Sequence, residues 1–169
     1  MKNEISLNEI SLKDSVVKSS PHPFALLVSG DKNKKNAMGI SWFTLVSMKP
    51  GKMVFAISQK GYSAELIDIG SFVSLCIPLI SIKEQAMNCC KASGRNTDKI
   101  AEFGIELVED NDRKAYIVKD SSVAWVLKVC EKTPVGDHNL YIADIVSCYG
   151  GESDKGLKSF EGYRRLDVL

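Results

Sequence analysis

The sequence predicts a mostly β fold with a few helices inserted in the middle of the chain. Strand-like runs rich in branched and aromatic residues alternate with turn clusters, and the two longest runs, 123–132 and 139–149, fall in the last third. Along 123–132 both faces are apolar, with Trp125 and Leu127 on one and Val126 on the other. A strand of this kind is covered on both sides, so we expect a closed barrel that also packs against helices or a partner chain.

The chain has the length of one domain and carries almost no net charge. At roughly 150 residues per domain, the 169 residues fit one domain, which we place at 21–150, between a lead-in at 1–20 and a C-terminal tail at 151–169. The 22 Lys and Arg residues against 21 Asp and Glu residues give a net charge of +1. This balance excludes an extended polyanion-binding face, so no nucleic-acid partner is expected.

The cysteines, histidines and apolar runs indicate the compartment. Five cysteines without a C-x-x-C spacing predict neither a zinc site nor a disulfide framework, and two histidines are too few for a histidine-based metal site. No apolar run approaches the ~20 residues that a bilayer requires, and the first residues lack the apolar stretch of a signal peptide. We therefore expect a cytoplasmic protein with no metal and no membrane partner.

The first half of the chain predicts a meander of antiparallel strands. A strand at 24–29 precedes a turn cluster at 30–36, and strand-like sequence resumes over 37–46. The Lys-Pro-Gly-Lys sequence at 49–52 interrupts it before another strand at 53–58. Because consecutive strands joined by short turns usually pair with each other, these strands are expected to follow one another in the sheet.

Helical signals follow around a further strand. Apolar spacing predicts a helix over 62–69, and a strand follows over 72–78. Ser81 and Glu84 have the spacing of a capping box, which opens a helix that runs to about Lys91. Residues 96–98 then cap a second short helix, and a small hairpin turns at 109–112, at the edge of the sheet.

The cysteines are expected to pack as small hydrophobic residues. Cys89 and Cys90 are adjacent on a predicted helix, where consecutive side chains point about 100° apart. A redox-active pair is the alternative, although a buried free cysteine is usually only packed. The other three lie within strand patterns and are assigned to the core: Cys76, Cys130 and Cys148.

A phosphate-binding segment is indicated where the strand at 53–58 meets the next helix. Ser58, Lys60 and Ser63 place two hydroxyls and a cation beside the free N–H groups of a helix N-terminus. Such an arrangement attracts phosphate. The alternative is ordinary capping of the helix by Ser63.

Two further segments are candidates for ligand contact. At 36–42 a run of small residues ends at Trp42, so the backbone can approach a flat ligand; the alternative is a hairpin strand with a bulge at Gly39. Gly136-Asp137-His138 forms the turn between the two longest strands. A histidine there can protonate, hydrogen-bond or stack on a ligand, and a solvated turn residue is the alternative.

Taken together, five segments in this order resemble the flavin reductase-like family, and within it the flavoredoxin branch. No single segment is specific to this family, but the order of the five over about 20–150 is specific to it. The segments are Pro23-Phe24-Ala25-Leu26-Leu27-Val28-Ser29, Asn36-Ala37-Met38-Gly39-Ile40-Ser41-Trp42, the Ser58 to Ile67 segment, Ser93-Gly94-Arg95 with Asp98-Lys99, and Gly136-Asp137-His138.

The resemblance implies a homodimeric, Greek-key-like split β-barrel that binds FMN non-covalently near the subunit interface. The residues implied along the isoalloxazine are Asn36, Ala37, Met38, Gly39, Ile40, Ser41 and Trp42. Those implied around the phosphate are Ser58, Gln59, Lys60 and Ser63, with Arg95 and Lys99 near it. His138 is implied as the catalytic residue that contacts NAD(P)H. The family commonly has Gly-Glu where this chain has Ala143-Asp144, a departure that bears on the reducing partner and not on FMN.

The leading functional interpretation is an oxidoreductase in which NAD(P)H passes a hydride to N5 of bound FMN. Reduced FMN would then pass electrons to free flavin, a ferric chelate or a protein. Since the cofactor carries this chemistry, no catalytic triad is required. The alternatives are an FMN electron carrier reduced by a protein partner, and a ligand-binding barrel without turnover.

Overall fold

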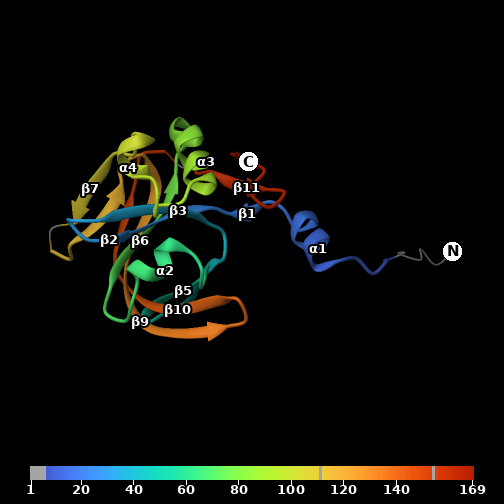
Figure 1. Cartoon of the computed structure of the whole chain (residues 1–169), viewed down its shortest axis with the longest axis horizontal. Helices are drawn as coiled ribbons and strands as arrows, with labels where there is room; N and C mark the ends of the chain where they lie inside the picture. Colours follow the sequence, from blue (N-terminus) through green and yellow to red (C-terminus); the bar gives the residue numbers. More distant parts are fainter. Residues whose placement is uncertain (1–6, 111, 154) are drawn as a thin grey trace.

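A seven-stranded antiparallel sheet forms the centre of the molecule (Figure 1). The computed structural model describes residues 7–110, 112–153 and 155–169. In spatial order the strands are β3 (Lys35–Ile40), β2 (Ala25–Gly30), β6 (Phe72–Pro78), β9 (Ser121–Val135), β10 (His138–Gly150), β5 (Gly51–Ser58) and β4 (Phe43–Met48). The predicted mostly β class is confirmed.

The sheet curls into a barrel because strands from both ends of this order pack on one inner core. Leu27 of β2, Phe55 of β5 and Tyr141 of β10 all belong to this core and are fully buried. The rings of Phe55 and Tyr141 stack with centroids 4.9 Å apart. Burial of these large side chains stabilises the curled sheet, whose edge strands are β3 and β4.

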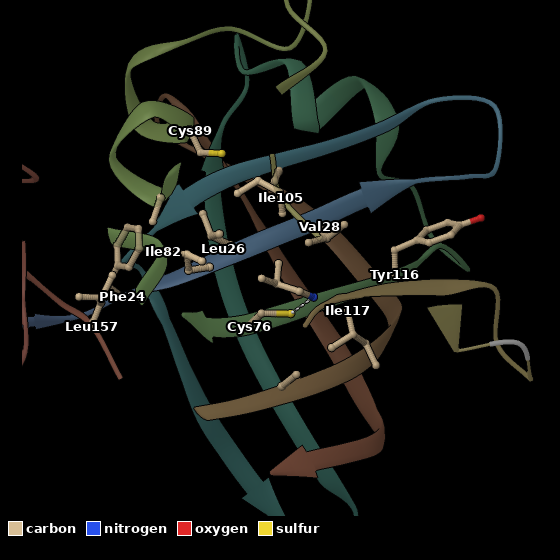
Figure 2. Close-up of a cluster of buried hydrophobic side chains, with 14 of the residues drawn as sticks. Phe24, Leu26, Val28, Cys76, Ile82, Cys89, Ile105, Tyr116, Ile117 and Leu157 are labelled. Carbon is tan, nitrogen blue, oxygen red and sulfur yellow. Dashed lines mark hydrogen bonds between the residues drawn. The ribbon is translucent and has the colours of Figure 1, made fainter. Parts of the chain in front are cut away.

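A second core lies on the outer face of the same strands. Leu26 and Val126 belong to this core, together with Cys89 of α3 (Lys83–Lys91) and Ile117 of β8 (Ala115–Val118). Figure 2 shows Leu26, Cys89 and Ile117 among its buried side chains. β9 therefore contributes to both cores, as its two apolar faces predict. β7 (Leu107–Asp110) pairs with β8, which confirms the small predicted hairpin, but the two strands form a sheet of their own and do not lie at the edge of the large sheet. Asn111 lies outside the described residues.

The predicted meander is wrong at one point. Residues 37–46 form two strands, because the chain turns at Ser41-Trp42 and passes from β3 at one edge of the sheet to β4 at the other. Ser41 is buried and shares a hydrogen bond with Ser159 Oγ at 2.8 Å, while the carbonyl of Trp42 accepts from Ala56 N–H at 2.9 Å. Strand propensity does not predict this corner, because the residues before it and after it both suit a β-strand.

The helices occur as predicted but begin and end differently. α2 (Tyr62–Leu66) is shorter than expected, and Gly61 precedes it without a side-chain cap. The capping box at Ser81 and Glu84 is not formed, because the 3₁₀ turn η1 (Ile80–Ile82) leads directly into α3. By contrast, Asp98 caps α4 (Lys99–Glu102) by accepting from Ala101 N–H, as predicted.

The two ends of the chain form structure that the sequence did not predict. α1 (Leu12–Lys18) buries no residue and projects away from the barrel (Figure 1). Beyond residue 150, Leu157 and Leu166 are fully buried in the outer core. Three short strands join the two ends into a small sheet: β1 (His22–Pro23), β11 (Lys158–Phe160) and β12 (Arg165–Asp167).

The cysteines predicted to lie in the core differ in how deeply they are buried. Cys76 is buried, and its sulfur accepts from Val118 N–H at 3.4 Å (Figure 2). Cys130 is half-buried and belongs to neither core, and Cys148 is exposed, so both assignments to the core are wrong. Cys148 lies near the end of β10, where Tyr149 and Gly150 are exposed as well. Within the described residues, no helix is long and apolar enough to cross a membrane.

Candidate functional site

A cavity of about 220 Å³ opens beside β3, the edge strand of the sheet. Segments that lie far apart in the sequence converge on it: β3, the start of α2, the end of α3 and the loop that follows. The lining residues are Asn36, Met38, Gly39, Lys60, Gly61, Tyr62, Ser63, Cys89, Cys90, Ala92, Ser93, Gly94, Arg95 and Lys99. Seven of them are among the residues that the sequence proposed for FMN, so tertiary folding brings three of the five resemblance segments to one place.

Asn36 leaves an unpaired acceptor in this cavity. Its side chain is 2% exposed, and its amide Nδ2 donates to Ser63 Oγ at 2.8 Å while Oδ1 has no partner. A buried acceptor without a donor costs about 1–3 kcal/mol. Gly94 leaves room for it, since a Cβ there would lie 2.2 Å from Oδ1. A ligand N–H or O–H would satisfy this atom.

The hydroxyl of Tyr62, at the start of α2, is also buried without a partner. Two cations lie over its ring, Lys34 Nζ at 4.9 Å and the Arg95 guanidinium at 6.0 Å from the centroid. Sequence reasoning missed Tyr62 and Gly94 as lining residues. Nothing in their local patterns distinguishes them from an ordinary helix start and an ordinary loop glycine.

The three candidate cations around the cavity differ in what they contact. Lys60 is exposed and makes no ion pair within the described residues. Arg95 donates to the Lys60 carbonyl at 3.2 Å and pairs with Glu65, so it braces the loop that carries Lys60. Lys99 is buried, donates to the Cys89 carbonyl at 3.0 Å, and has its pKa lowered by desolvation. Lys60 is therefore the cation best placed to meet an anion.

The hydroxyls at the predicted phosphate segment have distinct roles. Ser63 does not cap α2, so that alternative is wrong, and its Oγ instead accepts from Asn36. Ser58 Oγ accepts from Lys60 N–H at 3.3 Å and shapes the loop. Since α2 has only five residues, it can offer an anion free N–H groups but not a long helix dipole.

The two adjacent cysteines border the same cavity as thiols. Burial raises the pKa of Cys89 to about 11 and that of Cys90 to about 12, so both are protonated at neutral pH. A Cβ at Gly39 would lie 2.3 Å from Cys90 Sγ, so the glycine allows the thiol to approach β3. A protonated, buried thiol is a poor nucleophile, which favours the packing interpretation over a redox pair.

His138 and Trp42 form a second cluster outside the cavity lining. Their ring centroids are 4.7 Å apart at an interplanar angle of 44°, and the Trp42 side chain is 53% exposed. His138 Nδ1 lies 2.7 Å from Asp137 Oδ1, an interaction that is the main cause of a lowered pKa at Asp137. Gln59 Nε2 donates to the carbonyls of Gly136 and His138, so Gln59 braces this turn and does not line the cavity.

The remaining residues proposed along the isoalloxazine have buried side chains. Ala37 packs in the outer core, Ile40 packs in the inner core, and Ser41 bonds Ser159. They can offer only backbone groups to a ligand at the edge of β3. Their contact with a flavin stays a prediction, as does that of the other proposed residues.

A family model for the flavin reductase like domain matches residues 17–167. The chain belongs to the flavin reductase-like family. The match reaches well past residue 150, which agrees with the burial of Leu157 and Leu166 in the core. An uncharacterized protein of Archaeoglobus fulgidus is 27% identical over 140 residues, covering 82% of this chain and 78% of the relative.

Solved structures of flavoproteins share the fold. A flavoredoxin from Methanosarcina acetivorans has a TM-score of 0.84 and 19% identity, over 97% of this chain and 91% of its own. An FMN-binding protein from Thermus thermophilus has a TM-score of 0.82 and 18% identity, over 96% and 94%. An NADH:FAD oxidoreductase from Streptomyces globisporus has a TM-score of 0.82 and 13% identity, over 97% and 98%.

Proposed function

We propose that this protein is an FMN-binding oxidoreductase that takes a hydride from NAD(P)H and passes electrons to free flavin, a ferric chelate or a protein. The observation that carries the proposal is the cavity at the edge of β3. There the unpaired Asn36 Oδ1, the free amine of Lys60 and the start of α2 converge within a fold of the flavin reductase-like family. An anion with hydrogen-bond donors, such as FMN, complements this set of groups.

The cavity fits one end of FMN. Its volume of about 220 Å³ is below the ~300–1,000 Å³ of typical small-molecule sites, so the rest of the ligand must extend beyond it. We assign the phosphate to Lys60, Ser63 and the N–H groups that begin α2, and the ring to the outer edge of β3 toward Trp42. Bound FMN would supply a hydride acceptor at N5.

The protein's own residues would bind, orient and exclude water. Asn36 is held in one orientation by Ser63, so its free Oδ1 can select for a donor on the ligand. His138 is proposed to contact the nicotinamide, and Gln59 and Asp137 fix the turn that presents it. No side-chain acid or base is required for hydride transfer.

We also propose that the working unit is a homodimer. β4 is an edge strand, and Leu45, Val46 and Met48 on it are about half exposed or more. An apolar edge strand left uncovered invites aggregation, and a second copy of the chain would cover it. Light scattering during size-exclusion chromatography measures this directly, and a monomer at micromolar concentration would contradict it.

A reducing, cytoplasmic location is proposed as well, supported by five cysteines that form no disulfide.

The absorption spectrum of the purified protein tests the function. We expect bound oxidised flavin or, for flavin-free protein, a rise in melting temperature on titration with FMN. Anaerobic NADH or NADPH should then bleach the band near 450 nm, an approximate position for oxidised flavin. FMN binding without bleaching would favour the electron carrier reduced by a protein partner, and failure to bind FMN would leave only a barrel without redox function.

A further inference from the structure

The C-terminal segment 156–167 is tied into the molecule near both of its ends. Near its start, Leu157 N–H donates to the Pro78 carbonyl at 2.9 Å, and the Leu157 side chain is fully buried in the outer core that also holds Phe24 (Figure 2). Near its end, Leu166 is fully buried in the same core. The segment is therefore a fixed part of the fold, although it follows the last barrel strand in the sequence.

Between these two anchors, Ser159 reaches the corner where the chain leaves β3 for β4. Its hydroxyl lies 2.8 Å from that of Ser41, and both residues are buried, with Ser159 1% and Ser41 8% exposed. A buried hydroxyl that loses its partner is costly, so each serine holds the other in place. Because Trp42 directly follows Ser41, this hydrogen bond fixes the backbone from which the Trp42 side chain projects.

Tyr163 makes a second contact toward the same strand. Its ring meets the Phe24 ring edge-on, with the centroids 6.1 Å apart. Phe24 in turn packs against β3 at Gly39, where an added Cβ would lie 2.9 Å from Phe24 Cε2. Gly39 lines the cavity at the edge of β3. Two separate contacts thus connect the C-terminal segment to the strand along which the flavin ring is proposed to lie.

The side chain that the corner presents is Trp42, which stacks against His138. Their ring centroids are 4.7 Å apart, and Trp42 is 53% exposed. A ring exposed to this extent is held by few packing contacts, so its place against His138 depends on the backbone that carries it. That backbone is the one that Ser159 holds through Ser41.

We propose that the C-terminal segment 156–167 positions the β3–β4 corner for hydride transfer. Ser159 and Tyr163 act as positioning residues, because they hold the backbone that presents Trp42 to the nicotinamide and the flavin ring. The inference rests on the proposed function, in which the ring lies along β3 and the phosphate lies at the start of α2. Neither Ser159 nor Tyr163 is among the residues that line the cavity. The segment should therefore affect the ring end of the ligand and not its phosphate.

The first test needs no cofactor. A Trp125→Phe background leaves Trp42 as the one tryptophan, and a protonated imidazole quenches the fluorescence of an indole that it contacts. Emission should fall as His138 is protonated between about pH 8 and pH 5, and His138→Ala on this background should abolish the fall. Ser159→Ala should reduce the amplitude of the fall about twofold or more, since the Ser41 hydroxyl loses its partner.

Ser121→Ala is the matched control. Ser121 is 7% exposed and its hydroxyl donates to the Val118 carbonyl at 2.7 Å, so its removal also costs one buried hydrogen bond, away from the corner. Both serine variants should lower the melting temperature by similar amounts, but only Ser159→Ala should alter the quenching. Tyr163→Leu removes the ring contact with Phe24 and keeps the Ser159 hydroxyl, and it should act as Ser159→Ala does.

The second test separates the two ends of the flavin. Riboflavin has the ring of FMN without its phosphate. Ser159→Ala should weaken the binding of FMN and of riboflavin by the same factor, about threefold to tenfold, and slow anaerobic reduction of bound FMN by NAD(P)H about tenfold. Lys60→Ala should instead weaken FMN binding and leave riboflavin binding unchanged.

Unchanged quenching in Ser159→Ala, or an equal change in Ser121→Ala, overturns the proposal. A loss of FMN affinity that riboflavin does not share also overturns it, because the segment would then act at the phosphate. If the wild type binds neither flavin, the proposed function fails, and a reduced quenching amplitude in Ser159→Ala still shows that the segment positions Trp42.

Discussion

β5 has a lysine near each end, and the two amines have different surroundings. Lys52, near the start of β5, pairs with Asp144 on β10, and the Cys130 thiol donates to the other oxygen of that carboxylate at 3.0 Å. Lys60, two residues beyond the end of β5, makes no ion pair within the described part of the chain. Where the fold supplies the counter-charge, the lysine has a structural role; where it does not, a ligand anion can supply it.

The same contrast extends to the groups around each lysine. Near Lys52, the acceptors of Asp144 are occupied by a cation and a thiol. Near Lys60, Asn36 Oδ1 and the Tyr62 hydroxyl are buried without partners, and Gly94 packs so close to both residues that a Cβ there would collide with them. Unsatisfied buried polar groups in a native protein call for an explanation, and the proposed ligand would provide one here.

The largest effect should come from closing the cavity with Gly94→Ala. The new Cβ would lie 2.2 Å from Asn36 Oδ1 and 2.6 Å from a ring carbon of Tyr62, so buried neighbours must shift. We expect a loss of FMN affinity of tenfold or more and a fall in unfolding free energy of about 1–3 kcal/mol. Gly150→Ala, where a Cβ meets nothing within 4 Å, is the matched control. Unchanged FMN titration and melting curves for Gly94→Ala would show that this cavity is not where FMN binds.

Removal of the unpaired cation should be next in size. Lys60→Ala is expected to weaken FMN binding by about 1–3 kcal/mol, the scale of a charge-assisted contact, without loss of folding stability. Lys52→Ala is the control, because its amine is engaged by Asp144 and should leave the FMN dissociation constant unchanged. Equal effects of the two substitutions on FMN affinity would remove the distinction between the two lysines.

His138→Ala tests whether the second cluster serves the reductant. Anaerobic reduction by NAD(P)H should slow by about tenfold, the loss of one hydrogen-bond-sized contact, while FMN affinity holds. The other histidine offers a control, since His22 bonds the Val16 carbonyl near α1 and His22→Ala should not affect the rate. The reverse pattern, lost FMN affinity with normal reduction, would assign the 136–138 turn to the flavin.

The smallest effect is expected at the neutralised pair. Lys52 lowers the pKa of Asp144 in the folded protein. The ion pair's contribution to stability is therefore present above the unfolded-state pKa of Asp, about 3.9, and is lost as the pH falls through the lower pKa of the folded state. Asp144 raises the pKa of Lys52, so that contribution is lost only in strong base. Asp144→Asn should therefore lower the melting temperature slightly at neutral pH and flatten its acid dependence. An effect on FMN affinity would contradict a purely structural role.

Strand and helix positions followed closely from local pattern. The run at 72–78, the two long strands and the Asp98 cap were predictable because hydrophobic alternation and capping chemistry are local. The break at Ser41-Trp42 was not, because it depends on a partner, Ser159, that lies 118 residues away. The burial of Leu157 and Leu166 was missed for the same reason, since a short polar segment gives no sign of the core that it joins.

The candidate site could also be predicted only where it depends on neighbouring residues in the sequence. The residue types suited to an anion, Lys60 with Ser58 and Ser63, could be identified from the chain because a strand leading into a helix places them together locally. Which of them face a ligand could not be identified, because that depends on how Asn36, Gly94 and Arg95 approach from other segments.

The sequence by itself therefore determined the fold class, the doubly covered strand at 123–132 and the chemical character of the candidate anion-binding segment. These depend on periodicity and residue type, which are properties of short stretches. Only the tertiary structure decided that Asn36 keeps an unpaired acceptor, and that Arg95 is engaged while Lys60 makes no ion pair within the described residues. Those features are set by hydrogen-bond and charge partners that come from distant parts of the chain, and partners of that kind are chosen by folding.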